Sequence, residues 1–378
     1  VVNQFPDDMI FEESGPFISL YQPTHKHFPE NKQDPIVFKN LVREIEQSLQ
    51  KKIEKKLVSS FVKPFYELAE NRDFWNNTSA AIAVLASQNK CIVYNLHRSV
   101  KEFAVVADSF HIKPLIKAFQ SMENYHLLSL SRDNFTIYEG NRYGFTELKL
   151  DADAPRTSKE VLGDQLTDSY IGFGSFGGAG GQPVYYEQGG KKDEVDKDTE
   201  KYFRYVDRFV FENYSKPSKS PLILVSLKEY HSYFKRISHN SYLFHESIDA
   251  SYGTLEEKEL RSRASEIIEH INSEKTNEIL KSYEKAEADS LGSSDLAQVA
   301  KAASESRVAT VLIEADKIIP GKIQENGAIT FDDIEHPDVD DILDDLAVLV
   351  LSKKGRVVVL PKDEMPRATG VAAVFRYR

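Results

Sequence analysis

The sequence predicts a mixed α+β and α/β protein that is divided into three domains. A chain of 378 residues is longer than a single hydrophobic core usually organises. Apolar residues recur at helical spacing in some segments and alternate as in strands in others. Hydrophobic residues make up 41% of the chain and include 22 Phe, which is enough to form packed cores. We place the domains at residues 1–122, 123–272 and 273–378.

The first domain, residues 1–122, is predicted to be α+β. Alternating residues predict a strand over 17–21, and a turn-rich loop over 22–35 follows it. Two amphipathic helices come next, and the first has Pro35 in its opening turn behind Asp34 as the cap. The domain is completed by three strands, predicted at 80–85, 91–95 and 103–106, and by a short helix at 112–119.

The second domain, residues 123–272, contains a long segment with little hydrophobic periodicity. Residues 150–195 carry two glycine clusters, at 172–181 and 189–190. A loop of this length is either functional or disordered. Before this segment the sequence predicts two strands, at 126–131 and 135–139. After it we expect an amphipathic helix through Tyr202 and Val210, a buried strand at 221–226 and a closing helix at 254–272.

The third domain, residues 273–378, is predicted to be a small α/β sandwich. It begins with a helix at 295–304 behind a Ser293-Ser294 cap, a strand at 308–314 and a connecting segment at 318–331. A second helix at 340–352 and two strands, at 356–360 and 371–376, complete it. Residues 331–345 hold eight acidic residues. We expect Asp340–Asp345 to place negative charge at the N-terminus of the second helix and to form an acidic face.

Composition excludes several classes of protein. No stretch approaches the roughly 20 apolar residues that a membrane span needs, and the first residues lack the pattern of a signal peptide, so we expect a cytoplasmic protein. The single cysteine, Cys91, excludes a disulfide framework, and the histidines are not spaced as metal ligands. The glycine cluster matches neither a dinucleotide loop nor a P-loop. We therefore predict no metal and no cofactor.

Four short segments occur in an order that resembles the archaeo-eukaryotic class-I release factor and Pelota family. They are Ile18-Ser-Leu-Tyr21, Asp108-Ser-Phe-His111, Ile248-Asp-Ala-Ser-Tyr-Gly253 and Gly370-Val-Ala-Ala-Val-Phe-Arg-Tyr377. The chain is similar to a bacterial branch of this family. The resemblance implies a release-factor-like α+β first domain, an RNase H-like middle domain with a long glycine-rich loop, and an L7Ae-like third domain.

The resemblance assigns a role to Gly180, Gly181 and Gln182. In release factors a Gly-Gly-Gln tip enters the peptidyl-transferase centre and positions water against the peptidyl-tRNA ester. Two glycines permit close approach to RNA, and a backbone N–H can stabilise the developing oxyanion. A glycine-rich segment also yields this tripeptide by chance. The family has a basic helix after the tip, whereas residues 185–198 are broken by glycine and mainly acidic, and only Lys191 and Lys192 are candidates to meet phosphates there.

The codon-reading motifs of release factors are missing. The Asn-Ile-Lys-Ser loop and the Tyr-Cys pair do not occur in the first domain. A polar, moderately basic loop contains Lys26, His27, Asn31 and Lys32. This loop is a candidate contact with rRNA or mRNA, or it is an ordinary solvated turn.

Three functions remain open at this stage. The chain is a factor that docks in the ribosomal A site without decoding a stop codon, for rescue or hibernation, or it is a peptidyl-tRNA ester hydrolase acting through Gln182. The third alternative is a protein-interaction scaffold away from the ribosome, which the net charge of -11 favours because phosphate binding needs clustered Lys and Arg. The ribosome is an expected partner. The family resemblance implies a translational GTPase as a candidate partner of the third domain, and the acidic face favours a protein there rather than RNA.

Overall fold

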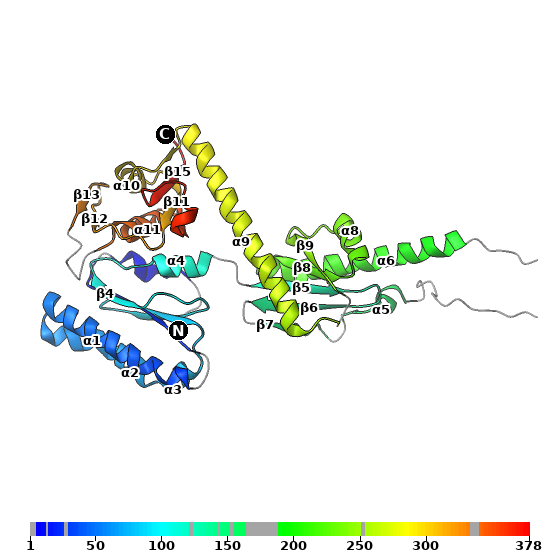
Figure 1. The fold of residues 1–378 in the computed structure, drawn as a ribbon, viewed down its shortest axis with the longest axis horizontal. Helices are drawn as coiled ribbons and strands as arrows, with labels where there is room; N and C mark the ends of the chain where they lie inside the picture. Colours follow the sequence, from blue (N-terminus) through cyan, green and yellow to red (C-terminus); the bar gives the residue numbers. More distant parts are fainter. Residues whose placement is uncertain are drawn as a thin grey trace, which may run out of the picture. The chain divides into compact units, whose positions relative to one another are not determined.

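The computed structural model describes residues 5–12, 14–25, 29–120, 124–141, 144–151, 154–163, 188–250, 254–332 and 340–378 (Figure 1). In the range 188–250, side chains are described from Glu194 onward. Helices and several sheets alternate along the chain, which confirms the predicted mixed α+β and α/β class. The chain forms two compact units. One unit joins Val1–Ser121 with Thr276–Arg378, and the other is Met122–Lys275.

The N-terminal part of the first unit is an antiparallel sheet in the order β3-β2-β1-β4. Its strands are β1 (Phe17–Pro23), β2 (Ala81–Ala86), β3 (Cys91–Leu96) and β4 (Phe103–Ala107). One face, carrying Ile18 and Leu20, is covered by α1 (Asp34–Lys52) and α2 (Lys55–Glu70). The short elements are η1 (Asp8–Phe11), η2 (Glu30–Lys32) and α3 (Arg72–Asn76), and α4 (Lys113–Gln120) follows β4.

The C-terminal part of this unit is built on a sheet in the order β10-β15-β11-β14. Its strands are β10 (Gly292–Ser293), β11 (Val308–Glu314), β14 (Arg356–Leu360) and β15 (Val371–Phe375). The helices α10 (Leu296–Ser304) and α11 (Ile342–Ser352), the hairpin β12 (Gly321–Ile323)–β13 (Ile329–Phe331) and η5 (Lys362–Glu364) complete it. The last turns of α9 (Glu257–Ala288) also belong here, because Tyr283 is buried against Leu312 and Val358.

The two parts of the first unit share one hydrophobic core. Buried residues of β1 to β3, α4, α10, α11 and the C-terminal sheet form a single cluster. At its edge the side-chain amide of Gln120 pairs with the backbone of Val359 in both directions, at 2.7 and 2.5 Å. The carboxylate of Asp344 accepts hydrogen bonds from the backbone N–H groups of Ile112 and Lys113, both at 2.8 Å. We call this contact region the seam.

The prediction that Asp340–Asp345 form an acidic face is wrong. Asp341 does cap α11, accepting from the backbone N–H of Leu343 at 3.1 Å. However, Asp340, Asp341 and Asp344 are all buried. Asp340 accepts from the backbone N–H of Asp108 at 2.9 Å, and Asp341 pairs with Lys113. These carboxylates satisfy donors of the N-terminal part across the seam, so they present no acidic surface there.

The second unit is a five-stranded mixed sheet in the order β7-β6-β5-β8-β9 (Figure 1). The strands are β5 (Tyr125–Leu130), β6 (Phe135–Asn141), β7 (Gly144–Glu147), β8 (Leu222–Ser226) and β9 (Leu243–Asp249). One face is covered by α6 (Gln188–Val210) and α8 (Lys228–Ile237), and the other by the first part of α9. The remaining elements are α5 (Ser158–Leu162), the π-helical turn η4 (Phe211–Ser215) and α7 (Lys216–Ser218).

Several predicted boundaries differ from the structure. The helix expected over 254–272 is α9, which begins at Glu257 and continues to Ala288 because Ile279, Leu280 and Tyr283 extend its apolar contacts. The glycine-broken run over 185–198 is helical from Gln188 onward. Asp34 lies inside α1, and Asp295, rather than Ser293 or Ser294, caps α10 by accepting from the backbone N–H of Gln298. The elements β7, α5, α8, β9 and the β12–β13 hairpin were not predicted.

Candidate functional site

The predicted site residues are unevenly placed. Gly180, Gly181, Gln182, Lys26 and His27 lie outside the described residues. Lys191 and Lys192 fall in the first turns of α6, where the backbone alone is described. Asn31 and Lys32 lie in η2. Asn31 is half-buried and Lys32 is exposed. The two lysines of α6 and the two residues of η2 belong to different units.

The loop around η2 is held by one buried carboxylate. Asp34 accepts from the backbone N–H of His25 at 2.7 Å, and its other oxygen lies 2.8 Å from His25 Nδ1. Asp34 is 2% exposed, while the His25 side chain remains 55% exposed. This arrangement orients the imidazole outward at the base of the loop that is either a candidate RNA contact or a solvated turn.

The helix α6 is the best-defined functional element of the second unit. Its buried residues Tyr202, Phe203, Val206 and Val210 pack on the sheet, as their helical spacing predicts. Two tyrosine hydroxyls anchor it to the segment before α5: Tyr202 donates to the carbonyl of Arg156 at 2.7 Å, and Tyr205 to that of Pro155 at 3.1 Å. Consequently the opposite face of α6 is fixed toward solvent.

A buried acid and a tyrosine fix α6 against the elements beside it. Asp207 is 6% exposed and accepts from the hydroxyl of Ser238 and, at 2.8 Å, from the backbone N–H of His239. In α8, the hydroxyl of Tyr233 donates to the carbonyl of Asp196 at 3.1 Å. Both contacts come from α8 and the residues directly after it, so α8 holds α6 at two points along its length.

The solvent-facing surface of α6 carries a line of four basic residues, Lys197, Lys201, Arg204 and Arg208. All four are exposed. Their spacing of four, three and four residues places them on one side of an α-helix, over about 16 Å of its axis. We call this set the basic stripe.

The stripe is only partly neutralised by carboxylates. Arg204 makes two hydrogen bonds with Glu200, the closer at 2.8 Å, and Lys201 lies 3.3 Å from Asp198. The hydrogen bond from Arg204 lowers the pKa of Glu200. Among the described residues no carboxylate pairs with Lys197 or Arg208. The two ends of the stripe are therefore open to an external anion.

Exposed cations in a row along a rigid helix are suited to the phosphates of a nucleic-acid backbone. Each Lys or Arg that meets a phosphate releases condensed counterions, which makes the binding strongly dependent on salt. The apolar spacing used to predict this helix defines only its buried face and did not indicate the stripe. The signal was present in the sequence as basic residues at positions i, i+4, i+7 and i+11, opposite Tyr202 and Val206.

No helix in the described part of the chain is both long enough and apolar enough to cross a membrane.

Comparisons with known proteins give a family and a set of distant folds. Residues 124–307 match the model of Bacterial archaeo-eukaryotic release factor family 3. No curated protein matches the chain. A solved structure described as ribosome-bound archaeal Pelota and ABCE1 is similar at 12% identity over 76% of this chain and 72% of that chain, with a TM-score of 0.42.

Two further structures are similar at comparable distance. Dom34 from S. cerevisiae, described as a translation termination-like factor interacting with Hbs1, has 12% identity over 82% of this chain and 78% of its own, with a TM-score of 0.41. The archaeal translation termination factor aRF1 has 13% identity over 96% and 92%, with a TM-score of 0.26. Residues 124–307, just under half of the chain, are thus similar to the bacterial branch of the archaeo-eukaryotic release factor family.

Proposed function

We propose that this protein docks in the ribosomal A site without decoding a stop codon, and that the basic stripe of α6 contacts RNA phosphates there. The family match over residues 124–307 carries this proposal, because it contains the whole second unit except its first two residues. The stripe supports it independently, since four exposed cations on one helix face are the feature that RNA backbone binding requires.

The acidic charge of the whole chain does not contradict this proposal. Between residues 194 and 219 there are six basic and six acidic residues. Four of the basic ones form the stripe, whereas Asp198 and Asp207 are buried beneath it. The exposed side chains of this stretch are therefore more often basic than acidic, and an RNA strand responds to the local field more than to the net charge of -11.

The proposal that the protein does not decode a stop codon rests on the sequence of the first domain. The family's codon-reading motifs do not occur in this sequence. We infer that the loop with Lys26, His27, Asn31 and Lys32 makes at most a contact independent of sequence with rRNA or mRNA. Binding to ribosomes is accordingly expected to be the same whichever codon stands in the A site. The three-domain division and a translational GTPase as partner of the third domain remain part of this proposal.

Cosedimentation with 70S ribosomes tests the proposal. The full chain is expected to pellet with ribosomes at low salt and to dissociate as salt rises. The fourfold variant Lys197→Glu, Lys201→Glu, Arg204→Glu and Arg208→Glu is expected to stay in the supernatant. A matched control reverses four exposed lysines of α1 and α2, namely Lys51, Lys55, Lys56 and Lys63. Wild-type protein that never pellets would favour a scaffold away from the ribosome instead.

A second candidate function is hydrolysis of the peptidyl-tRNA ester through Gln182. It is favoured by the position of Gly180-Gly181-Gln182 within the matched residues 124–307 and shortly before α6. Release of labelled peptide from stalled ribosomes, compared between wild type and Gln182→Ala, tests it. A rate that falls at least about a hundredfold in the variant supports catalysis, as expected for loss of a group that organises the transition state. Equal rates leave docking without catalysis.

A further inference from the structure

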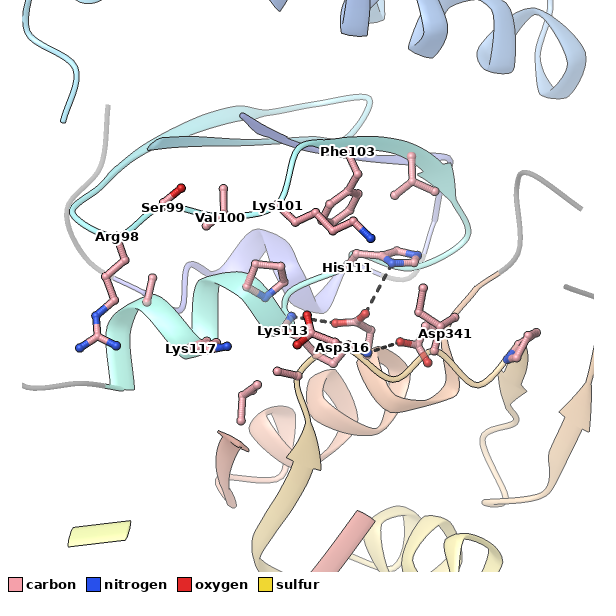
Figure 2. A pocket seen from close by; sticks show the side chains of 18 residues that line it. Arg98, Ser99, Val100, Lys101, Phe103, His111, Lys113, Lys117, Asp316 and Asp341 are labelled. Atoms are coloured by element: carbon pink, nitrogen blue, oxygen red, sulfur yellow. Dashed lines mark hydrogen bonds and ion pairs between the residues drawn. The ribbon is translucent and has the colours of Figure 1, made fainter. Parts of the chain in front are cut away.

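A cavity of about 510 Å³ lies inside the first unit, at the seam (Figure 2). Its walls come from the β3–β4 connection and β4, from α4, from the segment after β11, and from the N-terminus of α11. A volume of this size is typical of a pocket that takes a small molecule. The cavity is unrelated to the basic stripe of α6, which belongs to the other unit.

The body of the cavity is apolar. Val100, Phe103 and Val105 line it from the N-terminal sheet, and Pro114 and Ala118 line it from α4. Ile318, which is 65% exposed, extends this surface on the C-terminal side. A large aliphatic side chain left this exposed gains free energy when a ligand covers it. The aromatic ring of Phe103 is half-buried and offers a face or an edge to a flat ligand.

Cationic side chains surround this apolar body. Arg98, Lys101 and Lys117 line the cavity, as Figure 2 shows, and Asp316 is the exposed acid among them. Neither Lys101 nor Lys117 pairs with a carboxylate within the described ranges of the chain. Lys101 is exposed and Lys117 is half-buried. A carboxylate or phosphate group on a ligand would therefore meet an unpaired ammonium group at the rim of the cavity.

The two buried acids at the floor are already occupied by the protein. Asp341 pairs with Lys113 and also accepts from the backbone N–H of Ile319 at 2.9 Å. Asp344 accepts from the two backbone N–H groups of the seam, and its Oδ2 lies 3.5 Å from His111 Nδ1. Their charges are thus compensated inside the fold and do not exclude an anion. The Nε2 atom of His111, which also lines the cavity, is buried with no hydrogen-bond partner.

We propose that this cavity binds a small aromatic anion, with the ring against Phe103, Pro114 and Ile318 and a single carboxylate, phosphate or sulfonate group on Lys101 or Lys117. Because the walls belong to both parts of the first unit, the ligand bridges the seam. A ligand that binds only the closed seam stabilises it by mass action.

Fluorescence titration of the full chain with 8-anilinonaphthalene-1-sulfonate tests this proposal. The probe carries an aromatic body and one anionic group, and its emission rises when it leaves water. We expect saturable binding at one site per chain. The uncharged analogue N-phenyl-1-naphthylamine is expected to bind the wild type at least about tenfold more weakly, because it lacks the group that Lys101 or Lys117 binds. Equal affinity for both probes would overturn the role of the lysines.

Two kinds of variant make the test specific to the cavity. The double change Lys101→Gln and Lys117→Gln should weaken sulfonate binding about tenfold and leave the uncharged analogue unaffected. Ala118→Phe should abolish binding of both probes by filling the cavity. Lys56→Gln, on exposed α2, is the control and should change neither. Should Ala118→Phe fail to fold by circular dichroism, the lysine variant alone decides, and unchanged affinity there refutes the proposal.

Displacement then distinguishes the chemical sources of the ligand. An aryl carboxylate that competes with the probe, with no competition from a nucleoside monophosphate, supports the apolar interior as described. Competition by the nucleotide alone would refute an apolar ring as the bound group. Hydrogen exchange at α4 and at the N-terminus of α11 should slow when the ligand is bound, and unchanged exchange would refute bridging of the seam.

Discussion

Arg204 and Glu200 form an ion pair one turn apart on α6, with 2.8 Å between Nη2 and Oε1. The pair lies in the middle of the basic stripe, and Glu200 also accepts from Tyr233 of α8 at 3.4 Å. Glu200 therefore holds the arginine side chain along the helix and offsets part of its charge. An RNA strand that binds the stripe must compete with this internal carboxylate for Arg204.

Replacing Glu200 with Gln should tighten ribosome binding. The change removes one negative charge from the stripe and frees Arg204, so we expect the dissociation constant to fall about threefold at low salt. Filter binding over a series of ribosome concentrations measures it. Glu269→Gln makes the same charge change on α9, which covers the other face of the sheet, and should have little effect. Equal tightening by both variants would indicate a response to net charge and not to the stripe.

Replacing Lys197 with Gln should reduce the salt dependence of binding. Lys197 has no carboxylate partner among the described residues, so its contact with a phosphate releases counterions without breaking an internal pair. The slope of log affinity against log salt should become about one unit shallower. Lys216, which lies 3.3 Å from Glu212 outside the stripe, provides the control. A Lys197→Gln slope that equals the wild-type slope would exclude Lys197 from the interface.

Asp345 should make the first unit more stable in mild acid than at neutral pH. Burial raises the pKa of the Asp345 carboxyl group from 3.8 to about 6. Hydrogen bonds from Ser109 and from the backbone N–H of Ile323 lower this pKa, but the effect of burial is larger. The folded state thus keeps its proton up to about pH 6, whereas the unfolded chain releases it near 3.8. The free energy of unfolding should fall as pH rises between these values and remain lower above them.

Asp345→Asn tests this dependence because it keeps an acceptor for Ile323. The variant should be about 1–3 kcal/mol more stable than the wild type at pH 7.5 and similar to it near pH 4. Urea unfolding followed by hydrogen exchange in α11 provides the measurement. Asp363→Asn, at an exposed position in η5, is the control and should change stability little at either pH. A loss of stability for Asp345→Asn at pH 7.5 would show that the ionised carboxylate is favourable.

Gly140 in β6 should not tolerate a side chain. A Cβ atom there would lie 2.3 Å from the ring of Tyr125, which is fully packed on the neighbouring strand. Gly140→Ala is expected to destabilise the second unit by about 1–3 kcal/mol, because the ring must shift within a close-packed core. Gly144→Ala in β7 is the control, since a Cβ there meets only Glu257 at 4.0 Å. Comparable losses in urea unfolding would contradict this difference.

Local patterns predicted the apolar elements well. The strands over 308–314 and 356–360 have the bounds of β11 and β14, because uninterrupted apolar runs between polar turns leave little choice. The structure also explains why a glycine precedes the last strand and an arginine follows it. Gly370 has a φ of +87°, and Arg376 donates to the carbonyls of Lys353 and Lys354 at the end of α11, both at 3.0 Å. The glycine and the arginine therefore set the two ends of β15.

What the sequence did not predict depends on contacts between distant segments. Asp340 and Asp344 looked like an exposed acidic face because their partners, the backbone N–H groups of 108–113, lie more than 220 residues away. The first turns of α6 contain Gly189 and Gly190, which disfavour a helix locally. Burial of Asp198 and Thr199 and the hydrogen bond from Tyr233 support the helix here. Tertiary contacts of this kind leave no periodic trace in the sequence.

Competition with tRNA for the A site tests the central claim most directly. Binding of the full chain should be measured on 70S ribosomes whose P site is filled and whose A site is either empty or occupied by tRNA, with a sense or a stop codon in the A site. The account predicts binding to the empty A site with equal affinity for both codons, and loss of binding when tRNA occupies it. Binding that persists beside A-site tRNA, or that requires a stop codon, would contradict it.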